Sequence, residues 1–216
     1  ILTTYLMLLT QVLSIFGFAC YAASLTLIQS EWHLSNFESG FLASSFFIGY
    51  VLVVPFATTL TDRIDTRQIY LAGGLLASLG LFGMGYFSTD FHDAWFFLML
   101  HGAGISATYM PGLKIISDRV TMGEITRHIS FYTAFFGIGN ALSYFVSGIL
   151  ITQYGWREAF LITSMGPALA GILAWLGTQR LLGEKSFFEI KFDLKDAFPI
   201  LRWKKVLETK EALGYM

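Results

Sequence analysis

Few polar side chains in this sequence lie inside its long apolar runs, and these few could do chemistry. His101 is the only ionisable side chain well inside such a run, and Thr108 lies on the same helical face at i+7. Asn140 and Tyr144 share a face of a later run, and the first run has a similar polar face. Because hydrocarbon cannot solvate polar groups, the three faces should look into one water-accessible cavity. The candidate substrate-binding residues are Gln11, Tyr21, His101, Thr108, Asn140 and Tyr144.

His101 has two interpretations. Imidazole changes its charge close to physiological pH, so His101 could bind a substrate or carry a proton. In the second interpretation it is neutral and only hydrogen-bonds a neighbouring helix. The remaining histidines, His33, His92 and His128, are dispersed near the ends of apolar runs, so the sequence offers no clustered His and carboxylate ligands for a metal.

A short charged hairpin at residues 58–67 is the second candidate site. Asp62, Arg63 and Arg67 lie here between two apolar runs, and Arg127 stands at the start of a later run. An aspartate of this kind can pair with a helix end or a basic residue, and the pair can break when domains move. These four residues are the candidate gating residues. The alternative is a solvated loop that only fixes orientation.

The apolar runs that carry these residues predict six membrane-spanning helices. Hydrophobic residues make up 55 % of the chain and charged residues 13 %, whereas soluble domains have about 25 % charged residues. A spanning helix needs about 20 mostly apolar residues. The expected spans are roughly residues 3–28, 37–60, 69–87, 94–117, 129–153 and 159–182. Pairs of small residues should allow close helix packing, unless they only reflect the abundance of Gly in such segments: Gly73/Ala77, Gly102/Ser106, Gly137/Ala141 and Gly166/Ala170.

Charge asymmetry predicts the orientation and the domain limits. Thirteen of the 14 Lys and Arg residues fall in the even-numbered loops or the tail, and only Arg157 falls on the other side. Positively charged loops face the cytoplasm, so the N-terminus and the tail are expected there. Residues 1–182 should form the six-helix domain, residues 183–206 a cytoplasmic connector, and residues 207–216 the start of a seventh span. The chain begins without Met, and we expect it to be a fragment.

Three motifs of the sequence resemble the major facilitator superfamily. The hairpin matches the family pattern Gly-x-Leu-Ala-Asp-Arg-x-Gly-Arg-Lys/Arg at Leu60, Asp62, Arg63 and Arg67. Asp65 replaces the pattern's Gly at a tight turn, and because Asp tolerates the left-handed conformation better than most residues, we expect it there. The other motifs are Leu34-Ser35-x-x-Glu38-x-Gly40, followed by Gly49-Tyr50, and Gly155-Trp156-Arg157-x-x-Phe160.

This resemblance implies an all-α polytopic membrane protein. Its six-transmembrane-helix bundle would consist of two inverted three-helix repeats and form half of a twelve-helix fold. The first, second, fourth and fifth helices would line a central cavity. The implied function is secondary active or facilitated transport of a small solute by alternating access. The implied partners are a small-molecule substrate, a coupling proton or ion, the lipid bilayer and the C-terminal half of the same transporter, with no cofactor and no nucleic acid.

The chain departs from proton-coupled members of the family at two places. Leu98 stands where many have an Arg, and residues 141–143 replace the Gly-Pro pair of many antiporters, so both departures argue against proton antiport. Residues 107–114 resemble a bacterial group classed with cyanate and nitrate permeases, which favours a multi-pass protein of the bacterial inner membrane. No enzyme is expected, because the Gly-x-Ser-Gly motif of intramembrane proteases is absent from the sequence. The alternative function is a six-helix accessory or assembly protein without transport.

Overall fold

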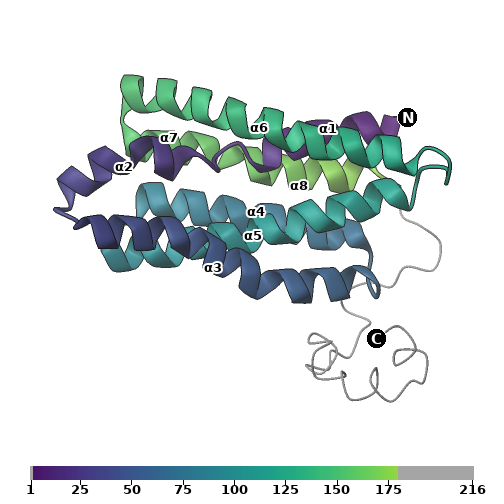
Figure 1. Ribbon diagram of the computed structural model, residues 1–216, viewed down its shortest axis with the longest axis horizontal. Helices are drawn as coiled ribbons and strands as arrows, with labels where there is room; N and C mark the ends of the chain where they lie inside the picture. The colour runs from purple at the N-terminus through teal and green to yellow at the C-terminus, as the bar shows by residue number, and fades with distance from the viewer. Residues whose placement is uncertain (1, 180–216) are drawn as a thin grey trace, which may run out of the picture.

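The computed structural model describes residues 2–179, and this part of the chain consists of helices joined by short turns. The helices are α1 (Leu2–Ser14), α2 (Cys20–Glu31), α3 (Asn36–Thr61), α4 (Thr66–Tyr86), α5 (Phe91–Ser117), α6 (Ile125–Tyr154), α7 (Trp156–Thr163) and α8 (Met165–Gly177). They run along one long axis, with α3, α4 and α5 in one layer and α1, α6, α7 and α8 in the other (Figure 1). The expected connector (183–206) and seventh span (207–216) lie outside the described residues.

These helices form the six expected spans, although two of the spans are broken. Helices α3, α4, α5 and α6 each form one span, of 26, 21, 27 and 30 residues. At about 1.5 Å per residue, each is long enough to cross a hydrocarbon core of about 30 Å. The first span consists of α1 and α2, and the sixth of α7 and α8. Within residues 2–179, α3, α4, α6 and the α7–α8 pair are both long and apolar enough to cross a membrane.

The break in the first span covers residues 15–19 and is held by a side chain from another helix. In hydrocarbon, backbone groups released by such a break must find partners inside the protein. The Ser143 hydroxyl of α6 accepts a hydrogen bond from the Ala19 N–H at 3.1 Å and donates one to the Phe16 carbonyl at 2.8 Å. Ser143 is fully buried, so its hydroxyl replaces the intrahelical partners that these two groups lack.

Helix α5 packs closely against both α3 and α4, because small residues let the backbones approach. A Cβ atom at Gly102 of α5 would collide with the backbone of Phe46 in α3, and one at Gly104 would collide with the backbone of Ala77 in α4. These contacts confirm the predicted small-residue interfaces of the third and fourth spans. The predicted contact at Gly137 of α6 is not seen among residues 2–179, where an added Cβ atom would meet no described atom within 4 Å.

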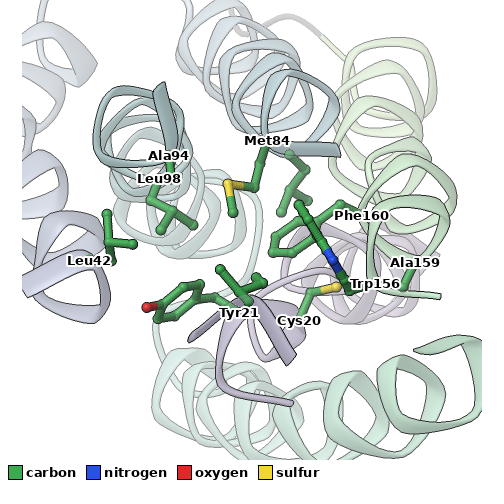
Figure 2. Close-up of a cluster of buried hydrophobic side chains, with 11 residues drawn as sticks. Cys20, Tyr21, Leu42, Met84, Ala94, Leu98, Trp156, Ala159 and Phe160 are labelled. Atoms are coloured by element: carbon green, nitrogen blue, oxygen red, sulfur yellow. The ribbon is translucent and has the colours of Figure 1, made fainter. Parts of the chain in front are cut away.

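The end of the bundle opposite the charged hairpin, called here the Trp156 end, is held by a hydrophobic cluster and a polar clasp. Trp156 and Phe160 of α7 belong to this cluster, together with side chains of α2, α3, α4 and α5 (Figure 2). The Trp156 indole donates to the Glu31 carboxylate at 2.7 Å, and the Arg157 guanidinium lies 3.5 Å from the same carboxylate. Arg157 also donates to the Ser88 carbonyl at 2.8 Å. The Gly-Trp-Arg motif therefore ties α7 to the ends of α2 and α4.

Candidate functional site

His101 lies at the contact between α5 and α4, almost fully buried at 2 % exposure. Its Nδ1 atom is 3.1 Å from the carbonyl oxygen of Ala77. A carbonyl oxygen can only accept a hydrogen bond, so Nδ1 carries the proton. Nε2 is buried too and has no hydrogen-bond partner among the described residues. The imidazole also lies beside the ring of Phe46, with 5.3 Å between the ring centroids.

An aromatic pocket in two adjoining parts lies beside His101. The first part, of about 180 Å³, brings together three of the predicted residues from three helices, namely Tyr21, His101 and Tyr144. The second part, of about 310 Å³, shares Phe18, Phe46 and Phe47 with the first and continues to Tyr50, Ile105, Tyr109 and Phe136. No Lys, Arg, Asp or Glu of the described chain lines either part. The pocket thus offers flat apolar rings and a few uncharged polar atoms.

The other three predicted substrate-binding residues lie outside the walls of this pocket. Gln11 is 1 % exposed, and neither atom of its amide has a hydrogen-bond partner among the described residues. Thr108 is also buried, and its hydroxyl donates to the Ile105 carbonyl of its own helix at 2.8 Å. Asn140 is half-buried, and its Oδ1 atom is shielded from solvent without a described partner. Whether these three contact a substrate stays a prediction.

Most of the aromatic residues that line the pocket were not predicted from the sequence. Phe46 and Tyr50 stand at i, i+4 on α3, and their rings lie 6.3 Å apart. Phe18, which the sequence did place with Tyr21 on the polar face of the first span, meets Phe46 edge to face, with 5.0 Å between centroids. The i, i+4 spacing of two rings in a span expected to line the cavity was the available signal. Polar groups inside the spans, which gave the predicted site, do not point to these rings.

At the charged hairpin, Asp65 and Arg67 form a buried ion pair, with the two residues 1 % and 8 % exposed. The guanidinium contacts both carboxylate oxygens, with Nη2 to Oδ2 at 2.6 Å and Nε to Oδ1 at 3.0 Å. Its Nη1 atom donates to the Thr178 carbonyl at 2.6 Å, and its Cζ atom lies 4.9 Å from the centroid of the Trp175 ring of α8. Arg67 therefore joins the start of α4 to the end of α8.

The backbone of Asp65 differs from the expectation. Its φ of −53° and ψ of 111° are extended, not left-handed. The carboxylate caps α4 by accepting a hydrogen bond from the Arg67 N–H at 3.0 Å. Asp replaces the family's Gly at this position because a capping and ion-pairing side chain is used here, so the turn does not need the conformational freedom of glycine.

The remaining candidate gating residues lie closer to the surface. Asp62 is exposed and lies 3.5 Å from Lys114 Nζ of α5, which makes the same contact with Asp118. Arg63 is half-buried and makes an interaction of its own. Arg127 is exposed at the start of α6, with its guanidinium 5.8 Å from the Phe131 ring centroid. The structure thus separates a buried structural pair from an exposed, weakly paired aspartate.

Six spans, a pocket between them and a charged hairpin at one end are the features of a membrane transporter fold. The sequence matches the Major Facilitator Superfamily over residues 7–212, so the chain belongs to this family. Membership of this family confirms the expected fold class. The finer resemblance to cyanate and nitrate permeases stays a prediction.

Individual relatives agree with this family. The chain is 28 % identical over 148 residues to a protein of Arabidopsis thaliana named "Probable sphingolipid transporter spinster homolog 1", covering 68 % of this chain and 30 % of the relative. It is 27 % identical over 145 residues to the niacin transporter NiaP of Acinetobacter baylyi, covering 67 % and 33 %. The chain therefore spans about a third of the length of these two relatives.

A solved structure shows the same fold. This is a bacterial homologue of the human lysosomal transporter Spinster, in an inward-facing and unoccupied conformation. The TM-score is 0.71 at 19 % identity, and the match covers 94 % of this chain and 48 % of that structure. At this low identity, the likeness shows only that the helices are arranged in the same fold.

Proposed function

We propose that this chain forms half of a transporter that moves a small solute across the membrane by alternating access. The observation that carries the proposal is the aromatic pocket, in which Tyr21, His101 and Tyr144 come together from α2, α5 and α6. Pockets of this kind, mostly apolar with a few convergent polar groups, are typical of small-molecule sites. Family membership supports transport, and it favours a transporter over an enzyme.

The other half of the site would come from six further helices that face this pocket. In alternating access, two such halves rock around a site near the midplane, so that it opens to each side in turn. His101, Tyr21 and Tyr144 would bind the solute in this half. Gln11, Thr108 and Asn140 lie outside the pocket walls and would reach the solute only after a rearrangement of the helices.

The charged hairpin is suited to two different tasks. The buried Asp65–Arg67 pair would hold the six-helix half together as one rigid unit while it rocks. The exposed Asp62, with its long contact to Lys114, could exchange that partner for one in the other half, and would bias the balance between the two states. Arg63 and Arg127 would act with Asp62 at the same surface.

The charge asymmetry supports a placement in the membrane. The hairpin end would face the cytoplasm, because positively charged loops are retained there. Trp32 and Trp156, which lie 5.5 Å apart edge to face, would then lie towards the opposite interface. A bacterial inner membrane is the proposed location.

Filling the pocket tests the proposal on the intact protein in proteoliposomes. Ala22 lines the pocket and is exposed, so Ala22→Trp should obstruct it without disturbing the core. Ala72→Trp, on the exposed face of α4 outside the aromatic pocket, is the matched control. Uptake of a panel of radiolabelled small solutes, niacin included, should reveal at least one that is transported and that Ala22→Trp slows at least tenfold. A protein that inserts and folds but transports none, or that both variants affect equally, would contradict the proposal.

A further inference from the structure

The tautomer of His101 fixes what the pocket can recognise. Nδ1 is committed as a donor to the Ala77 carbonyl, 3.1 Å away. The neutral ring therefore has a lone pair and no hydrogen at Nε2, which makes this atom an acceptor. His101 lines the first part of the pocket, and Nε2 is buried without a described partner, so a ligand reaches it only when the imidazole or a neighbouring side chain shifts. A buried acceptor left unpaired is unfavourable, so a ligand that supplies a hydrogen there gains binding free energy.

The walls of the pocket select for flat rings. Phe46 is at the centre, with Phe18, Tyr50 and His101 around it at centroid distances of 5.0, 6.3 and 5.3 Å. Aromatic pairs at such distances prefer offset-stacked or edge-to-face arrangements, and a further ring can join them in the same way. The first part, of about 180 Å³, is smaller than the pockets that enclose drug-sized ligands, so it suits a single ring system.

The charge of the walls narrows the solute class further. Lys, Arg, Asp and Glu are absent from the described lining of both parts. A ring that carried a full charge into this space would lose its hydration without finding an opposite charge in this half. An uncharged ring with a hydrogen-bond donor loses much less, because His101 can replace its water.

We propose that the pocket binds an uncharged aromatic or heteroaromatic ring that donates a hydrogen bond from an N–H or O–H group to His101 Nε2. The inference rests on the proposed transport function, and it names the solute class for that site. Phe46 and Phe18 hold the ring by edge and face contacts, and His101 sets its orientation. The pocket should prefer a ring with a donor to an analogue without one, because the analogue leaves Nε2 unpaired.

Two matched pairs of probes test this on the intact protein in lipid nanodiscs. Indole and benzothiophene are bicyclic rings of similar shape, but only indole has an N–H donor. Phenol and toluene form a second pair, differing in the O–H donor. Equilibrium binding should favour indole over benzothiophene, and phenol over toluene, by at least tenfold. Equal affinity within both pairs, or no saturable binding of either donor, would overturn the proposal.

Variants test whether His101 causes the preference for probes with a hydrogen-bond donor. His101→Phe keeps an aromatic ring but removes the acceptor, so the indole to benzothiophene ratio should fall to about one. Phe47→Leu, in an exposed position lining both parts of the pocket, should weaken both probes together and keep the ratio. Phe82→Leu, on the exposed face of α4, should change neither. An unchanged ratio in folded His101→Phe would overturn the proposal, and if that variant does not fold, the probe pairs still decide.

Uptake separates this inference from the transport function. In one outcome indole binds with the expected preference, but neither indole nor any other solute is transported. That outcome would refute transport and leave the proposed class of ligand intact. Transport of a ring-free solute that Ala22→Trp blocks, with no preference for indole, would refute the class and leave transport intact.

Discussion

Replacing Arg67 by Met should strongly destabilise the six-helix bundle. The guanidinium makes three contacts of 3.1 Å or less with the Asp65 carboxylate and one of 2.6 Å with the Thr178 carbonyl. It also lies over Trp175 of α8. Methionine fills a similar space but replaces none of these interactions. The Asp65 charge would then stay buried, at 1 % exposure, without its close contacts to the Arg67 guanidinium.

The size of the effect follows from the burial of the pair. Removing one partner of a buried ion pair typically costs about 3–5 kcal/mol, because the other charge is left in a poorly solvating environment. Removing both charges should cost less. In Asp65→Asn/Arg67→Met, the asparagine can still cap α4, since Asn and Asp are comparable capping residues. We expect the double variant to regain at least about 1 kcal/mol over Arg67→Met, a non-additive response typical of contacting residues.

The assay is the midpoint temperature for loss of monodisperse protein after heating in detergent. For a domain of 150–250 residues, 1 kcal/mol corresponds to about 2–4 °C, so Arg67→Met should lower the midpoint by at least about 6 °C. Arg127→Met, which removes an exposed arginine with one ring contact, is the control and should change it by about 2 °C or less. A midpoint within 2 °C of wild type for Arg67→Met would refute the reasoning. A double variant no more stable than the single would show that the buried charge is not the cause.

Three further predictions concern the break, the hairpin and the orientation. Ser143→Ala removes the hydroxyl that bridges Phe16 and Ala19 and should destabilise by about 1–3 kcal/mol in the same assay, whereas Ser130→Ala on the exposed start of α6 should have little effect. Asp62→Asn should leave the midpoint nearly unchanged, because exposed ion pairs contribute about 0–1 kcal/mol, but should alter the transport rate or the distribution between states; no change in either would mean that the hairpin only fixes topology. Cysteines replacing Met122 and His92, both strongly exposed, should react with an impermeant reagent from opposite sides of the membrane in a Cys20→Ser background, and labelling of both on intact cells would refute the orientation.

The span limits could be predicted closely, because in this chain the ends of apolar runs coincide with local capping signals. The second span was expected at residues 37–60, and α3 runs Asn36–Thr61. It begins at a capping box in which Ser35 and Glu38 satisfy each other's backbone N–H groups. Asp90 caps α5 in the same local way. Such signals lie within four residues of the helix start and are therefore readable from sequence.

The break in the first span could not be predicted, because its cause lies far along the chain. Ser143 is 124 residues from Ala19 and 127 from Phe16. Within residues 15–19 only Gly17 weakens a helix, and because Gly is frequent in membrane helices it does not by itself predict a stop. Asp65 is a mixed case, because its backbone is stabilised locally by Arg67 two residues on, and Arg67 is itself held by the Thr178 carbonyl 111 residues away. The break is a tertiary contact overriding a local preference, whereas the Asp65 backbone combines a local cap with the tertiary contact of Arg67.

The candidate site shows why polar residues alone reveal only part of a membrane pocket. A polar side chain in a span does not need a cavity when its own helix satisfies it, as the Ile105 carbonyl does for Thr108. An aromatic ring can face either lipid or a pocket. Because the chain has 21 Phe residues, residue type alone does not show which of them line the pocket. The packing around a ring distinguishes a ring that lines the pocket from one that faces outwards. Phe46 lies where α3 touches α5 at Gly102 and is 9 % exposed, whereas Phe82 on the outer face of α4 is 41 % exposed. The contact between its helix and α5, and not its residue type, therefore distinguishes Phe46 as a pocket residue.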